Sequence, residues 1–231
     1  MWPVDAQSLI ELQLELAQAA PRPWRPAPGE LRIGGCWVCF PRGLNGPGRA
    51  GDVAWAAAVL MRGGAVLDRE VRRGVAGAPY SPGLLARRIG GLMEATVRSW
   101  STPVDVLLLD ATARDHPRGA GLALHLGAEL DLPTVGITHR PLLARGEWPA
   151  DRRGDTSPLW LGDTVVGCWI RTRPGVRPLV VHPGWRVDLP TAVEVVSRTT
   201  WQHRTPEPLR GARRLARSAR SAAEGRPAHL S

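Results

Sequence analysis

The chain has 231 residues, of which 43% are hydrophobic, and this is enough to bury the core of one α/β domain. Its three cysteines are too few for a disulfide framework. With so few cysteines, we expect a reduced, cytoplasmic protein. Acidic residues at positions 5, 11 and 15 interrupt the apolar character of the first segment, so we expect no export or membrane segment. We interpret residues 1–223 as a single domain and residues 224–231 as a disordered tail.

The formal net charge of +9 favours an anionic partner such as DNA or RNA, because basic side chains replace the counterions condensed on phosphates. All 30 basic residues are arginine, a bias that a GC-rich coding sequence produces without functional demand. Much of the excess charge lies at residues 204–226, and this segment fits either a solvated helix or a disordered arm.

The first predicted elements are a helix and a group of strands. Leu9, Leu12 and Leu16 recur at helical spacing within residues 6–20, and a proline-rich stretch ends that helix. Apolar runs at 31–40 and 53–60 flank a turn-forming segment and predict an antiparallel pair, with a third strand at 65–71. Strand alternation would point Cys36 and Cys39 to opposite faces, so we expect no CxxC metal or redox site.

The rest of the chain predicts alternating helices and strands. A helix is expected over 84–100, after the segment APYSPG. The apolar run 106–109 ends in Asp110, which is typical of a central strand that is buried on both faces and carries a polar group at its carboxyl end. Helices are then predicted at 121–130 and 191–200, and strands at 134–138, 164–173 and 179–182.

Several stretches together resemble the endonuclease V family, which cuts near deaminated bases such as inosine in DNA or RNA. They are GDVAWAAAVL, APYSPGLLARR, VLLLDATARDHPRGAGLALHLGAELDLPTVGIT and VHPGWRVDLPTAVEVV, followed by HRTPEPLR. The resemblance covers nearly the whole chain. It implies an α/β protein with a ribonuclease H-like fold, in which helices flank a mixed central β-sheet.

The resemblance also implies a divalent metal, usually Mg²⁺, held by three acidic side chains, because a hard cation prefers oxygen ligands near the attacking water and the phosphate. At the first two of these positions the chain carries Trp37 and Ile89, and Asp110 keeps the third. The family's active-site lysine is replaced by His139, and a family histidine by Trp185. We therefore expect no ordinary metal-dependent cleavage, and a role for Mg²⁺ only if some nuclease activity remains.

The remaining candidates for catalysis are Asp110, His116 and His139. Asp110 fits either a functional carboxylate or a structural cap after a buried strand. His116 and Arg118 fit either contact with a phosphate or support of a tight turn.

The PYSPG segment corresponds to the loop with which the family wedges apart bases beside the lesion. A ring on a proline-stiffened loop can stack on a base for about 1–3 kcal/mol, although the segment could equally hold a corner of the fold. The predicted nucleic-acid-binding residues are Pro79, Tyr80, Ser81, Pro82, Gly83, Arg118 and Arg186.

Four functions stay open at this point, and one of them is an inert subunit of a larger complex. The first is a catalytically impaired endonuclease V-like protein that binds deaminated nucleic acid, and the second is a residual or altered endonuclease. The third is a scaffold reused for a small molecule, with Trp37 and Trp185 lining an aromatic pocket. Against the pocket stands a simpler interpretation, in which Trp37, Trp185 and Ile89 only fill the former acidic cleft.

Overall fold

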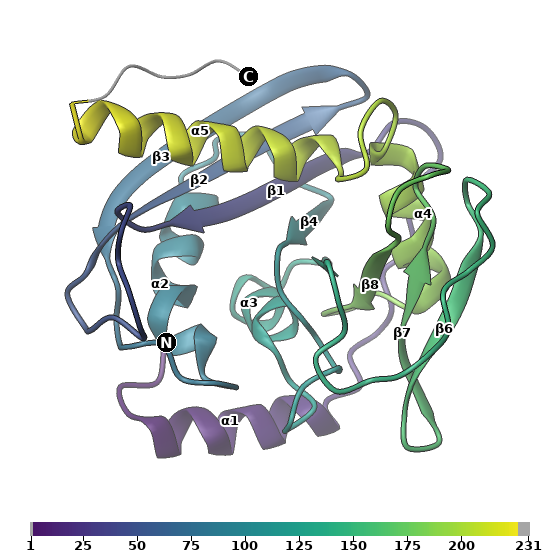
Figure 1. Cartoon of the computed structure of the whole chain (residues 1–231), viewed down its shortest axis with the longest axis horizontal. Helices are drawn as coiled ribbons and strands as arrows, with labels where there is room; N and C mark the ends of the chain where they lie inside the picture. The colour runs from purple at the N-terminus through teal and green to yellow at the C-terminus, as the bar shows by residue number, and fades with distance from the viewer. Residues whose placement is uncertain (1, 226–231) are drawn as a thin grey trace.

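The computed structural model describes residues 2–225, in which eight strands form one mixed sheet in the order β3-β2-β1-β4-β5-β8-β7-β6 (Figure 1). β1 runs parallel to β4 and β4 parallel to β5, whereas the other neighbouring pairs are antiparallel. The strands are β1 (Arg32–Cys39), β2 (Val53–Arg62), β3 (Ala65–Val75), β4 (Val106–Leu109), β5 (Thr134–Thr138), β6 (Thr156–Leu161), β7 (Thr164–Ile170) and β8 (Leu179–Pro183). The helices are α1 (Ala6–Gln18), α2 (Leu85–Val97), α3 (Leu122–Leu130), α4 (Leu189–Thr199) and α5 (Glu207–Ala223).

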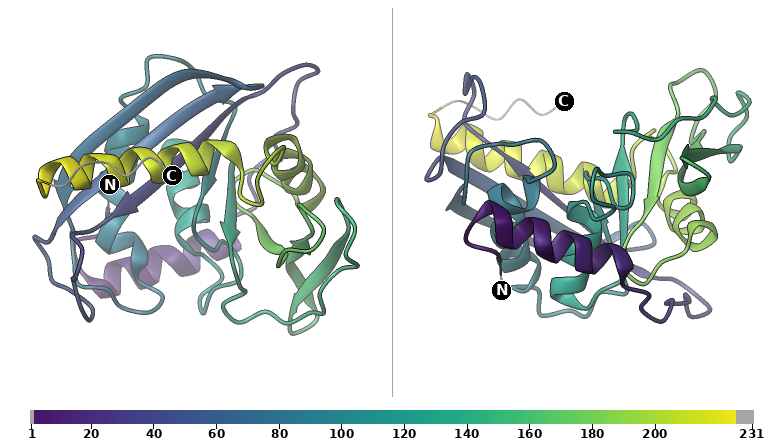
Figure 2. Two further views of the ribbon diagram at one scale, coloured as in Figure 1. Left: turned by 45° about the horizontal axis from the view of Figure 1, so that its top comes forward. Right: turned by 90° about the horizontal axis from the view of Figure 1, so that it is seen from below.

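Helices cover both faces of the sheet, as the views in Figures 1 and 2 show. On one face α1, α2 and α3 pack over a core that includes Leu107 and Leu109 of β4. On the other face α4 packs over Val106 and Leu108, and α5 lies across β1 and β2. β4 is therefore buried on both faces, as its continuous apolar run predicts.

A glycine of β1 brings α5 close to the sheet. A Cβ atom on Gly35 would lie 2.4 Å from the carbonyl carbon of Pro208 and 2.5 Å from the backbone nitrogen of Leu209. Only a residue without a side chain leaves room for that approach. The buried side of α5 then consists of small and apolar residues, among them Leu209, Ala212 and Ala216.

Most predicted elements are confirmed within a few residues, and the expected mixed α/β class with flanking helices is confirmed as well. α1 starts where expected, because the Asp5 carboxylate caps it by accepting the backbone N–H of Ser8. The prediction missed β6. This strand contains Pro158, which argues against a central strand, and β6 does lie at the edge of the sheet, where proline is tolerated.

The cysteines and the basic C-terminal segment follow the sequence interpretation. Cys36 packs into the α2 side of the sheet and Cys39 into the α5 side, and both are free thiols. The arginine-rich segment forms the long helix α5, and Glu224 and Gly225 follow it as a turn, whereas 226–231 of the predicted tail lie outside the described residues. Within residues 2–225, no helix has the length and apolar character needed to cross a bilayer.

Candidate nucleic-acid interface

The main candidate residues lie together where the parallel strands β1, β4 and β5 end, which we call the carboxyl edge of the sheet. In the register of the sheet, Cys36 pairs with Leu109, and Leu109 pairs with Gly136. The side chains that follow these strands, Asp110 and His139, therefore lie at one edge, beside Trp37. The indole Nε1 of Trp37 donates a hydrogen bond to Asp110 Oδ2 at 3.2 Å, and Asp110 is exposed.

Two arginines of α5 cover Trp37. The guanidinium carbons of Arg213 and Arg217 lie 5.6 and 5.3 Å from the centre of the Trp37 ring, within the range of a cation–π contact. Partial burial lowers the pKa of Arg217 from its ordinary value, and the neighbouring charge of Arg213 lowers it further. Positive charge is thus concentrated beside the Asp110 carboxylate.

The surroundings of His139 favour the neutral form of its ring. Burial of part of its ring lowers the pKa, the charges of Arg204 and Arg213 lower it further, and the Asp110 carboxylate opposes these effects. A neutral imidazole can donate one hydrogen bond and accept another. His139 can therefore serve a phosphate as a hydrogen-bond donor but does not add a full charge.

The residues at this edge do not fit the Mg²⁺ that the family resemblance implies. Mg²⁺ requires near-octahedral oxygen ligands, usually with one or two carboxylates. Here Asp110 offers a carboxylate that already accepts an indole N–H, and the guanidinium groups over Trp37 repel a cation. Among residues 2–225, no three His, Cys, Asp or Glu side chains form a group that could hold a metal ion.

The PYSPG loop is held by its last residue. The Gly83 carbonyl accepts hydrogen bonds from Gln13 Nε2 at 3.0 Å, from Arg118 Nη2 at 2.7 Å and from His116 Nε2 at 3.1 Å. Gly83 has φ +74°, and a Cβ there would lie 2.7 Å from the Arg118 guanidinium. The loop is therefore fixed from α1 and from the segment that follows β4.

Both ring nitrogens of His116 take part in that support. Nε2 must carry the proton, because the Gly83 carbonyl can only accept, and Nδ1 accepts the backbone N–H of Arg118 at 3.3 Å. Burial, followed by the charge of Arg118, lowers the pKa of His116 to about 4. His116 and Arg118 thus make the turn-supporting contacts that were one of their two predicted roles.

Tyr80 projects from this supported loop with 50% of its surface exposed, and its backbone N–H donates to Pro47 O at 2.7 Å. A buried ion pair anchors the same corner, since Arg88 Nη2 lies 3.1 Å from Asp52 Oδ2 and Arg88 Nη1 donates to Ala78 O. The ring of Tyr80 makes no hydrogen bond among the described residues, so it is available for stacking.

The structure does not bring Trp185 and Arg186 to this edge. The Trp185 backbone pairs with Thr134 at the start of β5, and its indole donates to Asp131 Oδ1 at 3.2 Å. Arg186 lies 3.5 Å from the same carboxylate. Since β5 runs parallel to β4, this is the opposite edge of the sheet from Asp110.

This placement corrects two expectations. Trp37 and Trp185 do not line one aromatic pocket, and they do not fill one cleft together. Ile89, by contrast, lies on α2 beside the core that contains Leu109, so its apolar side chain packs where the family resemblance implies a carboxylate.

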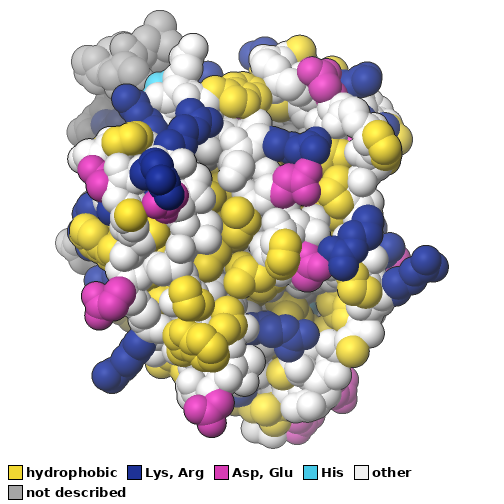
Figure 3. Space-filling view, turned by 90° about the vertical axis from the view of Figure 1, so that its right-hand side faces the viewer, with side chains coloured by type: hydrophobic (Ala, Val, Ile, Leu, Met, Phe, Trp, Pro, Cys, Tyr) yellow, Lys and Arg dark blue, Asp and Glu magenta, His cyan; other side chains and the backbone are white. Residues whose placement is uncertain are grey.

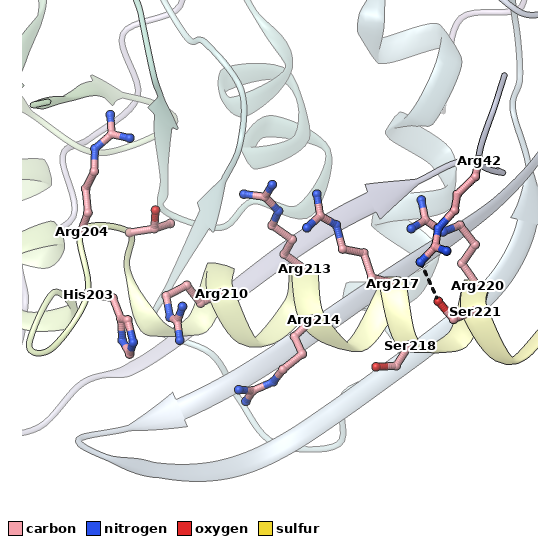
Figure 4. Close-up of a pocket in the computed structure, with 11 residues that line it drawn as sticks. Arg42, His203, Arg204, Arg210, Arg213, Arg214, Arg217, Ser218, Arg220 and Ser221 are labelled. Atoms are coloured by element: carbon pink, nitrogen blue, oxygen red, sulfur yellow. Dashed lines mark hydrogen bonds between the residues drawn. The ribbon is translucent and has the colours of Figure 1, made fainter. Parts of the chain in front are cut away.

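A basic groove runs along α5, and Arg213 and Arg217 lie in its middle part (Figure 4). It has a volume of about 620 Å³, and within the described part of the chain no Asp or Glu lines it. The β6–β7 end of the molecule differs, because acidic and basic side chains are interspersed there (Figure 3). The arginines that line the groove from α5 and from the loop after β1 are Arg42, Arg210, Arg213, Arg214, Arg217 and Arg220.

The sequence interpretation missed several residues of this region. Arg213 and Arg217 appeared only as part of a basic segment, although their four-residue spacing places them on one side of a helix. Asp115 was overlooked too. It is fully buried and accepts the backbone N–H groups of Leu142, Leu143 and Ala144 at 2.7–2.9 Å, which ties the loop after β5 to the loop after β4.

Comparison with known proteins identifies relatives along most of the chain. The family profile described as Endonuclease V matches residues 32–214. The Endonuclease V of Methanopyrus kandleri is 44% identical over 161 residues, which cover 69% of each chain. That of Gloeobacter violaceus is 36% identical over 225 residues, which cover 96% of this chain and 89% of the relative.

Solved structures agree with these matches. The Endonuclease V of Streptomyces avermitilis superposes with a TM-score of 0.86 at 33% identity, over 96% of both chains. The catalytic domain of human Endonuclease V gives a TM-score of 0.82 at 30% identity, over 96% of this chain and 98% of that one. With a family profile that spans more than half of its length and relatives of this similarity, the chain belongs to the endonuclease V family.

Proposed function

We propose that this protein binds deaminated, inosine-containing nucleic acid and does not carry out ordinary metal-dependent cleavage. One observation supports the proposal most strongly. The Asp110 carboxylate accepts the Trp37 indole N–H beneath two guanidinium groups, and this arrangement favours a phosphate over a divalent cation.

The nature of the ligand is supported by a structural relative. The Endonuclease V of Ciona intestinalis, which shares this fold at a TM-score of 0.79 and 20% identity, was solved with a 24mer DNA containing an inosine followed by a ribo-adenosine. Its likeness to this chain concerns the fold alone, so inosine recognition is a proposal here. The half-exposed Tyr80 on the anchored PYSPG loop supplies an aromatic face against which a neighbouring base can stack.

The test is binding of matched inosine-containing and unmodified strands in EDTA. The expected result is tighter binding of the inosine-containing strand, with affinity reduced about tenfold in Tyr80→Ala, which corresponds to stacking worth about 1.4 kcal/mol. Arg22→Ala serves as a control that keeps the preference, because Arg22 is exposed and lies two residues before Trp24, whose backbone N–H donates to Arg186 O at the opposite edge of the sheet. Equal affinity for the two strands, or no effect of Tyr80→Ala, would overturn the proposed recognition.

A second candidate is residual or altered cleavage, and the exposed Asp110 carboxylate beside His139 is the observation that favours it. Incubation of the inosine-containing strand with excess Mn²⁺ tests it. A cut that Asp110→Ala abolishes would establish this activity in place of binding alone.

A further inference from the structure

α5 packs on the sheet through an apolar side that buries Leu209, Ala212 and Ala216. Among its arginines, Arg220 donates to Phe40 O, and Arg213 and Arg217 lie over Trp37. Arg213, Arg214 and Arg217 are exposed on the rest of the helix surface. Figure 4 shows the arginine side chains spread along the helix, from Arg204 and Arg210 at one end to Arg42 and Arg220 at the other.

The charge in this groove is mostly uncompensated. Arg210 approaches Glu207 Oε2 at 3.3 Å, but among the described residues Arg213, Arg214 and Arg217 have no ion pair or hydrogen bond. Arg217 is crowded by Arg213, Arg220 and Arg42. Since like charges held this close repel one another, an anion that spans the groove would relieve the repulsion.

The groove is also continuous with the candidate nucleic-acid site. Arg213 and Arg217 line the groove and cover Trp37 at the same time, and Trp37 contacts Asp110. With a rise of 1.5 Å per residue, these two arginines are separated by about 6 Å along the helix axis. A row of cations that passes the site suits an extended chain of anions better than one compact anion.

We propose that the groove along α5 binds the phosphate backbone of a single nucleic-acid strand, independently of the lesion. Guanidinium groups recognise phosphate with paired N–H donors, and basic grooves that follow a strand bind it without sequence preference. The inference rests on the proposed function, because the strand that enters the groove is the one that passes Asp110.

The experiment compares Arg42→Gln/Arg214→Gln, two exposed groove arginines that do not cover Trp37, with a matched double variant, Arg22→Gln/Arg152→Gln, whose arginines are exposed and outside the groove. Affinities for single strands of about 30 nucleotides, with and without inosine, are measured in EDTA at several salt concentrations. For the groove variant we expect about tenfold weaker binding of both strands and a salt slope that is smaller by about 1.4, or about 0.7 for each phosphate that the variant no longer neutralises. The ratio between the two strands stays unchanged, and so does the melting temperature.

The outcomes separate this inference from the proposed function. An inosine preference in the wild type, with equally weakened binding in the two double variants, would overturn the groove but leave inosine recognition intact. Binding without inosine preference that is weakened in the groove variant alone would support the groove and overturn inosine recognition. Displacement of the strand by polyglutamate at equal charge concentration would assign the groove to an acidic polypeptide and overturn the proposal.

Discussion

Two aspartates of the segment after β4 differ in their exposure and in their hydrogen-bond partners. Asp110 is exposed at the sheet edge, where it accepts the Trp37 indole N–H, whereas Asp115 is fully buried and accepts three backbone N–H groups. The position of Asp110 could be predicted, since it follows a continuous apolar strand. Asp115 could not, because its partners lie almost thirty residues further along the chain and no local pattern marks them.

Replacement of Asp115 by alanine should therefore destabilise the protein. It leaves the N–H groups of Leu142, Leu143 and Ala144 without their acceptor, and the expected decrease is about 2–3 kcal/mol in the free energy of unfolding. Chemical denaturation measures it. Asp110→Ala is the matched control and should change that free energy by less than about 0.5 kcal/mol, as is usual for an exposed position. Equal decreases of the free energy of unfolding in the two variants would contradict this structural role of Asp115.

Buried histidines should make the protein sensitive to acid. Burial lowers the pKa of His125 and of His182 from 6.5 to about 4. The unfolded chain therefore takes up protons between pH 6.5 and pH 4 that the folded chain does not, so the stability present above pH 6.5 is lost as the pH falls through this range.

His125→Leu tests that dependence. His125 stacks on Trp2 at 4.5 Å, and its ring nitrogens make no hydrogen bond among the described residues. The variant should reduce the slope of unfolding free energy against pH by up to about 1.4 kcal/mol per pH unit. Denaturation at about pH 4.5, 5.5 and 7.5 measures the slope, and an unchanged slope would show that His125 is not a buried neutral group.

Among the elements, the contact between β1 and α5 has the greatest consequence for the site. It places Arg213 and Arg217 over Trp37, and it depends on Gly35. The sequence predicted β1 and left the arginine-rich segment as a helix or an arm. Leu209, Ala212 and Ala216 alternate with arginines at helical spacing, so the sequence itself favours an amphipathic helix here. What the sequence could not show is that the apolar side of this helix covers β1 and β2.

A methyl group at Gly35 should separate these two elements. Gly35→Ala would bring a Cβ within 2.4–2.6 Å of the backbone of Pro208 and Leu209, and such overpacking typically costs about 1–3 kcal/mol. Gly64→Ala, where a Cβ meets nothing within 4 Å, is the control and should have little effect on stability. Thermal or chemical denaturation compares the two, and similar stabilities would argue against close contact between β1 and α5.

For the whole molecule, the sheet topology decides which of the predicted residues can act together. The resemblance predicted the fold and named Asp110 and His139 as site residues, and the register of the parallel strands brings both to one edge. Trp185 was wrongly grouped with them, because a sequence motif does not reveal which end of an antiparallel strand it follows. β8 runs against β5, so the residues after β8 lie at the opposite edge.

The most direct test of the account is a titration of Mg²⁺ into the wild-type protein bound to an inosine-containing strand, with affinity and strand integrity measured together. Because the site offers Asp110 beneath arginines and no second carboxylate at Trp37 or Ile89, Mg²⁺ should not raise the affinity above its value in EDTA. The strand should remain uncut. Mg²⁺-dependent cleavage beside the inosine that disappears in Asp110→Ala would contradict the account.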